Sequence, residues 1–326
     1  MSELLAKILY GINSVIHSYG WSMILFTLIV KLLILPLDYK SRKSMRKMSI
    51  VQPEMQRLQK KYADDKEKLN KKMAELYRRE GVSPTAGCLP MILSMVVLWI
   101  MWGAMRTVAN AELVEQCIEL LTTGTTVNEG FLWIKNIWMP DSPFAPVIAE
   151  QKSLMMIQAA DWAKGFAALT ADQIAKLAEF GIDASNFNAE TVSAALATLP
   201  IYAEQTQLFP YLPSLNLFIA NLKIYANNNG WFILPLLAAV TQYLMTLSQP
   251  QAAPADPNNP AASTNNFMKY FFPLFSLWIC SSYNALFSLY WVVSNIFAWI
   301  QSIVLNKVFD HQDKVKKETV KEGTLK

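Results

Sequence analysis

An apolar run that contains one charged residue constrains this chain most. Residues 20–37 are apolar or uncharged except for Lys31. A helix of this length rises about 27 Å, close to the thickness of the hydrocarbon core of a bilayer. An ammonium group near the middle of a bilayer costs roughly 2.5–3.5 kcal/mol. The run therefore predicts a membrane-spanning helix in which the charge of Lys31 needs compensation.

Two interpretations of Lys31 are open at this stage. No Asp or Glu occurs in any of the long apolar segments, so Lys31 has no acidic partner there and suggests a cationic site for an acidic ligand. Alternatively, the side chain snorkels toward the polar stretch that begins at Asp38. That stretch lies about 10 Å further along a helix, and a lysine stem spans part of the distance.

The composition is typical of a polytopic membrane protein with sizeable polar segments. Of 326 residues, 53% are hydrophobic and only 17% are charged. We predict an all-α integral membrane protein with five transmembrane helices. Their expected ranges are 19–37, 86–108, 231–248, 267–283 and 285–306. A tight polar turn at 281–284 separates the last two, because the alternative, a single helix of about 40 residues, is too long for a bilayer.

The charge distribution predicts the orientation in the membrane. Residues 38–84 contain fourteen Lys/Arg and seven Asp/Glu, whereas residues 109–229 contain five Lys, no Arg and twelve Asp/Glu. Because positively charged loops stay in the cytoplasm, the first segment is expected inside and the second outside. The N-terminus is then external and the C-terminus cytoplasmic.

The cytoplasmic segment 38–84 has the pattern of a helical hairpin. Its turn is expected at 63–66, and Gly81 should end the second arm. Pro53 should break or kink the first arm. Apolar residues at helical spacing form one narrow seam on each arm, so we expect the arms to pair loosely. The seam residues are Met55, Leu58 and Tyr62 on the first arm and Leu69, Met73 and Leu76 on the second.

The remaining segments flank these elements. Residues 1–18 form an amphipathic helix that lies at the membrane interface or packs on the protein. Residues 249–266 form a flexible cytoplasmic linker rich in Pro, Ala and Asn, and residues 307–326 form a basic cytoplasmic tail. The external region should contain amphipathic helices near 152–168, from Thr170 with Gln173 in a capping box, and after Asn188.

Several of these stretches together resemble the YidC/Oxa/Alb family of membrane protein insertases. They are residues 28–37 (LIVKLLILPL), 48–53 and 73–77 of the hairpin, 81–90 before the second span, 231–236, and 289–295 (LYWVVSN). Lys31 stands where the family usually has Arg, and Ser94 where it often has Gln. Residues 284–286 replace the usual Pro-x-Gly. Residues 141–229 have no counterpart that we recognise, and we expect a small helical cap there.

The resemblance implies a groove open to the cytoplasm and to lipid but closed outside, in a bacterial plasma membrane. A wet groove would also compensate Lys31. Phe232, Tyr243 and Trp291 could form an apolar sliding surface for clients. The expected groove residues are Lys31, Thr27, Ser94, Thr241, Gln242, Ser288, Tyr290, Trp291, Ser294 and Asn295. For each polar residue the alternative is structural: Ser and Thr bond their own helix backbone, and Asn and Gln join helices.

The expected function is insertion and folding assistance for newly made membrane proteins. The expected partners are nascent membrane proteins and lipids, with the ribosome and the Sec translocon as further candidates and no nucleic-acid substrate. No nucleotide loop, metal motif or nucleophile–base pair is visible, so we expect neither a cofactor nor an enzyme. Two alternatives stay open: an assembly scaffold without insertion activity, and a small secondary transporter, which would need inverted repeats and intramembrane carboxylates.

Overall fold

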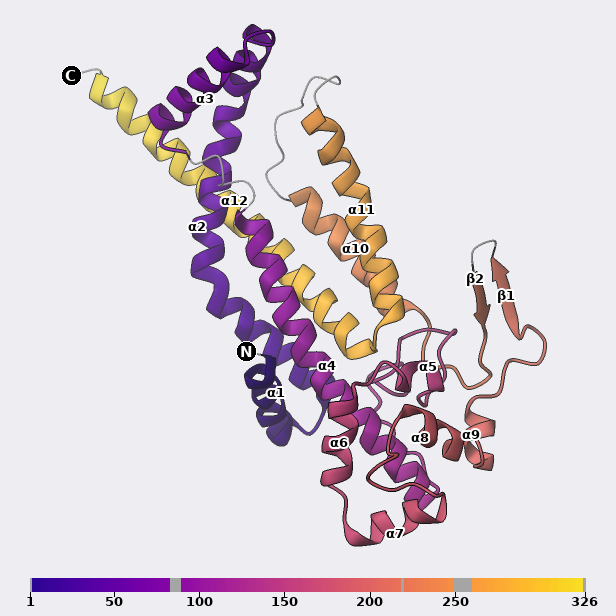
Figure 1. The fold of residues 1–326 in the computed structure, drawn as a ribbon. Coiled ribbons are helices and arrows are strands. Elements are labelled where there is room, and N and C mark those ends of the chain that lie inside the picture. Colours follow the sequence, from indigo (N-terminus) through magenta and orange to yellow (C-terminus); the bar gives the residue numbers. More distant parts are fainter. Residues whose placement is uncertain (1, 83–88, 218–219, 249–259, 325–326) are drawn as a thin grey trace. The chain divides into compact units, whose positions relative to one another are not determined.

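The computed structural model describes residues 2–82, 89–217, 220–248 and 260–324 (Figure 1). The chain divides into two compact units. The first unit comprises Met1–Phe26, Ile100–Ala238 and Ser276–Val292. The second unit comprises Thr27–Trp99, Ala239–Phe275 and Val293–Lys326. Long helices pass from one unit into the other, and each unit is described below by itself.

In the first unit, the N-terminal helix α1 (Ser2–Ile16) packs on the protein along one face only. Ala6 and Leu9 are buried, whereas Leu4 and Val15 remain exposed. A Cβ atom on Gly103 of α4 would lie 2.8 Å from the Ser2 hydroxyl, so the start of α1 lies against α4. The helix α1 is therefore amphipathic, as expected, and the face that carries Ala6 and Leu9 is covered by protein.

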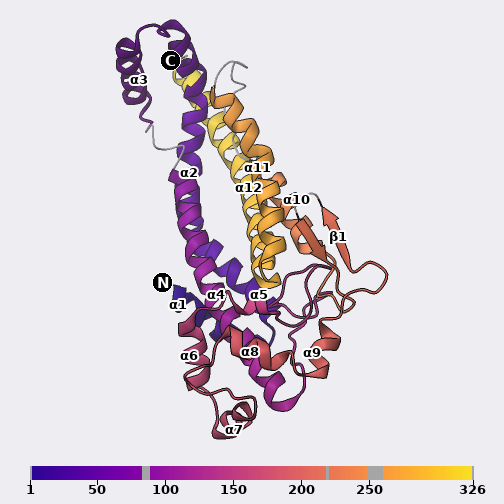
Figure 2. The same ribbon diagram turned by 45° about the vertical axis from the view of Figure 1, so that its right-hand side comes forward.

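Helix α4 (Leu89–Thr123) continues fifteen residues beyond the predicted span 86–108, and most of it belongs to the first unit. Its last turns are buried, including Val114, Cys117 and Leu121. Five short helices belong to the same unit (Figure 2). They are α5 (Gln151–Leu154), α6 (Ala159–Ala167), α7 (Ala171–Glu179), α8 (Ala189–Leu196) and α9 (Pro200–Gln205).

The start signals read in the external region are confirmed. Thr170 and Gln173 form a reciprocal capping box at the start of α7, and Asn188 forms one with Thr191 at α8. The single helix expected over 152–168 is wrong, because α5 and α6 are separated there. Residues 155–158 turn the chain so that Leu154 and Ile157 are both buried.

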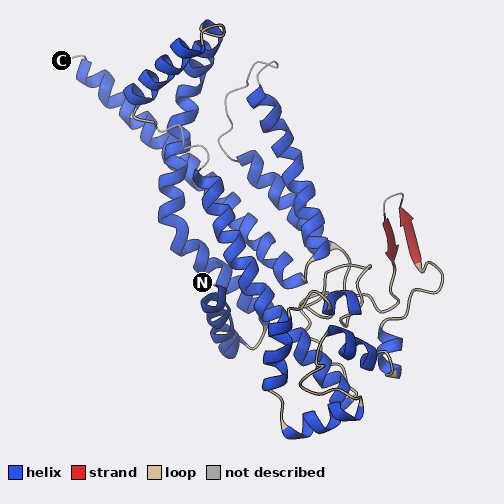
Figure 3. Cartoon of the chain, viewed as in Figure 1, coloured by secondary structure: helices blue, strands red, loops and turns tan. Residues whose placement is uncertain are grey.

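The expectation of a purely helical external region is also wrong. Strands β1 (Ser214–Leu217) and β2 (Ala220–Lys223) pair antiparallel, with Ser214 opposite Lys223 and Leu215 opposite Leu222 (Figure 3). Alternating polar and apolar residues favour a strand, and Pro210 and Pro213 oppose a helix in the preceding stretch. This alternation was visible in the sequence.

In the second unit, helix α2 (Tyr19–Lys61) continues without a break through the predicted span into the first arm of the hairpin. Pro53 lies inside α2, so of the two predicted outcomes, a break or a kink, the break does not occur. A proline within a helix can be accommodated as a kink when surrounding packing holds both sides. Val51, two residues before it, is buried in the core of the hairpin.

The two arms of the hairpin pair through a defined core, which corrects the expectation of loose pairing. Val51, Leu76 and Val82 are buried, and Met48, Met55, Leu58 and Tyr77 pack against them. The second arm is α3 (Lys66–Glu80), which ends at Gly81 with φ 60°, as expected of a C-terminal glycine. The chain turns at 62–64, close to the predicted position.

Three further helices carry the apolar sequence of the C-terminal half: α10 (Ile233–Ser248), α11 (Pro260–Ser282) and α12 (Ala285–Thr324). Helix α11 begins inside the predicted linker. It ends within the predicted turn, where Asn284 Oδ1 accepts a 2.9 Å bond from the Phe287 amide and caps α12. Among the described residues, α2 and α12 have stretches long and apolar enough to cross a membrane, and α10 is a shorter apolar helix. The count of five spans stays a prediction.

Candidate functional site

Helix α12 is bonded to α10 along one face in the second unit. Asn295 Nδ2 donates to Thr241 Oγ1 at 3.4 Å, which joins two of the predicted groove residues. Further along, Ser302 Oγ donates to the Ser248 carbonyl at 2.7 Å, and Asn306 Nδ2 donates to the same oxygen at 3.1 Å. Residues 295, 302 and 306 are seven and four apart, so they share one face of the helix.

A different face of α12 is bonded to α2. Gln301 Nε2 donates to Asp38 at 3.5 Å, and Arg46 pairs with Asp310 and Asp313 at 2.5 and 2.9 Å. Residue 38 of α2 is bonded to residue 301 of α12, and residue 46 to residues 310 and 313, so the two helices run in the same direction.

Lys31 lies on the face of α2 that meets α12. Asp38 and Arg42 follow it by seven and eleven residues, which places all three on one helix face, and both act electrostatically on Lys31. The Lys31 side chain is partly buried, and within the described part of the chain no carboxylate lies within 4 Å of its ammonium group.

Arg42 adds a second cation to this face. Its Nη2 donates to the Ala298 carbonyl at 3.5 Å, but its Nη1 is buried without a hydrogen-bond partner in the described part of the molecule. Burial lowers the pKa of the guanidinium, and the charge of Asp38 opposes that shift. A buried donor of this kind gains a hydrogen bond when a polar or acidic ligand reaches it, and the cost of leaving the donor unpaired is removed.

The other predicted groove residues divide between the two units. In the second unit Thr27, Gln242 and Ser294 are buried, like Thr241 and Asn295. Ser94 lies where the structure describes only the backbone. In the first unit Tyr290 is buried, Ser288 Oγ donates to the Cys280 carbonyl at 2.9 Å, and Trp291 Nε1 donates to Ser276 Oγ at 3.1 Å. The Ser288 hydroxyl thus bonds the backbone of the preceding helix α11, and it also lies 3.4 Å from the Asn284 carbonyl, just before the first residue of α12.

Sequence reasoning missed the polar residues that join α12 to its neighbours. Ser302 and Asn306 lie at helical spacing from Asn295, and this periodicity could have been read from the sequence. Arg42 and Arg46 were counted only as part of a basic loop. Their partners are more than 250 residues away, so nothing local in the sequence identifies them.

A buried polar network holds the start of α10 in the first unit. Asp141 accepts bonds from the Trp231 amide at 2.9 Å, the Leu234 amide at 2.6 Å and the Trp133 indole at 3.1 Å. Asn229 donates to the carbonyls of Asn136, Met139 and Pro140 at 2.8, 3.1 and 2.9 Å. Its side-chain oxygen accepts from the Asn136 amide at 2.8 Å. The two ends of the external insertion are therefore tied to each other and to the start of α10.

A carboxylate cluster lies where α2 begins, also in the first unit. The Tyr19 hydroxyl donates to Glu112, and the Tyr19 amide donates to Glu129 Oε1 at 2.6 Å. Burial raises the pKa of Glu112 to about 7. The Tyr19 bond opposes this shift, whereas the charges of Glu115 and Glu129 add to it.

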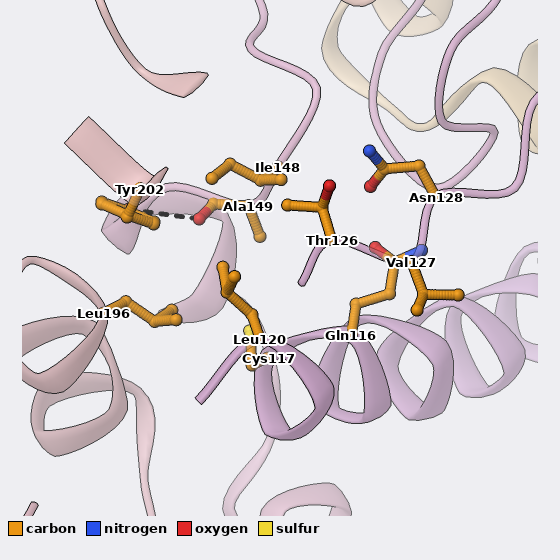
Figure 4. Close-up of a pocket in the computed structure, with 10 residues that line it drawn as sticks. All are labelled: Gln116, Cys117, Leu120, Thr126, Val127, Asn128, Ile148, Ala149, Leu196 and Tyr202. Atoms are coloured by element: carbon orange, nitrogen blue, oxygen red, sulfur yellow. Dashed lines mark hydrogen bonds between the residues drawn. The ribbon is translucent and has the colours of Figure 1, made fainter. Parts of the chain in front are cut away.

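A small pocket in the first unit is distinct from these polar groups (Figure 4). Tyr202 closes one side, and its hydroxyl donates to the Ala149 carbonyl at 3.3 Å. Cys117 lines the floor, and burial raises the pKa of its thiol to about 12, so it is a poor nucleophile. The lining is Gln116, Cys117, Leu120, Thr126, Val127, Asn128, Ile148, Ala149, Leu196 and Tyr202. The lining contains no carboxylate, histidine, lysine or arginine side chain.

A match to a known protein family covers most of this chain. A family model described as 60Kd inner membrane protein matches residues 11–313. The chain belongs to this family. The resemblance to the YidC/Oxa/Alb proteins is thereby confirmed, and the long apolar helices agree with a membrane protein.

Individual relatives match shorter parts of the chain. A protein named membrane protein insertase YidC from Anaeromyxobacter dehalogenans is 34% identical over 154 residues, which cover 47% of this chain and 26% of the relative. One of the same name from Fusobacterium nucleatum is 37% identical over 107 residues, covering 33% of this chain and 52% of the relative. Another from Chlorobium limicola is 38% identical over 130 residues, covering 40% and 20%. The matches thus span about a fifth to a half of these relatives.

Proposed function

We propose that this chain inserts newly made membrane proteins into the bilayer and assists their folding. The observation that carries the proposal is Lys31, a cation in an apolar helix whose face toward α12 also carries Arg42 with an unpaired buried donor. Family membership and the names of the relatives agree with it. The proposed groove residues are those predicted above, with Lys31 at the centre.

The proposed mechanism is electrostatic attraction followed by release into lipid. In a wet cavity surrounded by apolar helices, an incoming carboxylate is attracted to Lys31 more strongly than in bulk water, because the effective dielectric constant is lower. The apolar part of the client then moves sideways into the bilayer, where burial of its apolar surface drives the reaction. On the outer face of α2, Leu32 and Leu33 are exposed, which suits contact with lipid.

The proposed topology has five spans, with the N-terminus outside and the C-terminus in the cytoplasm of a bacterial cell. It rests on the excess of Lys and Arg in residues 38–84 and of acids in residues 109–229. The basic hairpin would then face ribosomes and nascent chains. Nascent membrane proteins are the proposed clients, and the ribosome and Sec translocon are candidate partners. No bond is made or broken in this function.

Variants of Lys31 test the proposal. The purified protein is placed in proteoliposomes, and insertion of a small client with an acidic translocated segment is compared with that of a neutral version. Lys31→Ala should reduce insertion of the acidic client roughly tenfold, which corresponds to about 1.4 kcal/mol, and spare the neutral one. Lys31→Arg should retain activity, and Lys31→Glu should be worst for the acidic client.

Lys40→Ala is the matched control, because it removes an exposed cation from the same helix outside the apolar run. It should leave both clients unaffected. Full activity of Lys31→Ala on the acidic client would contradict the charged groove and favour snorkelling. No insertion of either client by the unmodified protein would instead favour the scaffold. Transport of a small solute by the same vesicles would favour the transporter.

A further inference from the structure

The segment 208–225 in the external region has a composition unlike its surroundings. Lys223 is its only charged residue, and most of the others are apolar or aromatic. Helices α7, α8 and α9 and the loop between α7 and α8 expose acidic side chains that suit water. These exposed acids are Asp172, Glu179, Asp183, Glu190 and Glu204. The segment is therefore the charge-poor part of an otherwise acidic surface.

Several apolar residues of the segment are exposed in the first unit. Tyr211 is 90% exposed, Leu212 49%, and Phe209 and Leu215 40% each. Phe209 and Tyr211 lie edge to face with their ring centres 5.9 Å apart. Soluble surfaces seldom carry such a contiguous apolar patch unless something covers it.

The pairing register makes the hairpin amphipathic. Leu215 lies opposite Leu222, and Ser214 lies opposite Lys223. Directly opposed residues share a face, so one face carries leucines and the other carries Ser214, Lys223 and the exposed Asn216. Within the described chain, β1 and β2 pair only with each other. A two-stranded hairpin is marginally stable in water, so this one gains from a surface that covers its apolar face.

The base of the hairpin is joined rigidly to the start of a predicted span. The Phe209 amide donates to the Ile224 carbonyl at 2.8 Å, and Tyr225, buried beside it, donates its hydroxyl to Glu150 at 2.5 Å. A few residues later Asn229 and Asp141 hold the start of α10.

We propose that residues Phe209, Tyr211, Leu212, Leu215 and Leu222 dock on the lipid surface of the leaflet on their own side of the membrane. Apolar and aromatic side chains on one face, with polar groups on the other, are what an element lying in the interface requires. Because the first unit also carries the exposed Trp231 at the start of α10, the hairpin extends a lipid contact that the span itself makes. The proposal rests on the protein being embedded in a membrane and not on its insertase activity.

Site-specific probes test this contact. Single cysteines at Leu215 and Tyr211 carry an environment-sensitive fluorophore in the full chain, reconstituted in phosphatidylcholine–phosphatidylglycerol vesicles. Cys88 is replaced by Ser, and Cys117 and Cys280 are buried. Lipids with a nitroxide on the upper acyl chain should quench both probes roughly twofold, as for an element at the interface. A probe at Asn216 on the polar face and one at Glu204 on α9 are the controls and should stay accessible to acrylamide.

The outcomes separate the candidate covers. Lipid quenching at 215 and 211 but not at 216 and 204 supports the proposal. Equal acrylamide access at all four sites means that the hairpin stands in water, which overturns it. Protection from acrylamide without lipid quenching means that protein covers the face, either a second copy or a partner, which also overturns it. Tyr211 is almost fully exposed, so its substitution tests the idea even if the Leu215 variant folds poorly.

Discussion

The first unit contains fully buried polar residues that each make several hydrogen bonds, whereas the long helices of the second unit expose leucine side chains. In the first unit Asn136, Asp141 and Asn229 are fully buried and each makes several hydrogen bonds. In the second unit Leu33 is 77% exposed and Leu274 65%. A folded unit must give every buried polar group a hydrogen-bond partner, whereas a surface in contact with lipid can expose leucine side chains. The exposed leucines of the second unit are therefore compatible with contact with lipid.

The largest expected effect is in the polar network of the first unit. Asn229→Ala removes four hydrogen bonds and leaves the Asn136 amide buried without its acceptor. We expect it to destabilise the first unit by about 3–4 kcal/mol. Thermal unfolding in detergent, followed by near-UV circular dichroism, measures the change.

Asn228→Ala is the matched control for this substitution. Asn228 is partly buried and joins Pro146 through a backbone bridge that alanine can also make. Its effect should stay within about 0.5 kcal/mol. Equal destabilisation by both variants would mean that the network does not hold this unit.

A smaller, local effect is expected in the second unit. Leu76→Ala removes a buried side chain from the core of the cytoplasmic hairpin and should cost about 2–3 kcal/mol there. Hydrogen exchange should rise in residues 48–58, which pack opposite, while the first unit keeps its melting temperature. Lys71→Ala, on an exposed position of α3, should change neither quantity. A fall in the stability of the first unit would show that the two regions unfold together.

The smallest expected effect concerns Glu112. Its pKa is about 7 in the folded protein and near 4.5 when unfolded, so the folded state holds the proton more tightly. The stabilisation is complete below about pH 4.5 and is lost as the pH rises to about 7. Because Glu112 is partly exposed, we expect a loss of about 1–2 kcal/mol.

Glu112→Gln should flatten this dependence between about pH 4.5 and 7 without affecting the second unit. Melting curves of the first unit at steps of pH measure it. A wild-type profile that stays flat, or a stability that rises with pH over this range, would contradict the assignment of a raised pKa to Glu112.

The sequence predicted what depends on local pattern. The apolar runs, the capping box at Thr170, the glycine stop at Gly81 and the turn before Asn284 are all signals within a few residues, and the structure has them. The family was also recognisable from short motifs. The continuity of α2 was not predicted. This helix passes through Pro53 without a break, since tertiary packing at Val51 outweighs the local preference for a break.

The candidate site was predicted by residue type but not by pairing. Lys31, Thr241 and Asn295 were identified because polar residues are unusual in apolar helices. The pair of α2 with α12 was missed, because residues such as Arg46 and Asp310 are far apart in the chain and each looks like an ordinary surface charge. The β-hairpin was missed for another reason, since its alternation was visible and was passed over in favour of helices.

The unbroken helix α2 has a mechanical consequence. From Lys31 to Lys61 it spans thirty residues, about 45 Å, within the second unit. A straight helix of this length transmits a force applied at one end to its other end unless it bends. Pro36 and Pro53 each lack the amide that would complete a helical bond, so they are the points of least stiffness. A force on the hairpin therefore acts through a helix whose inner flexible point, Pro36, lies five residues from Lys31.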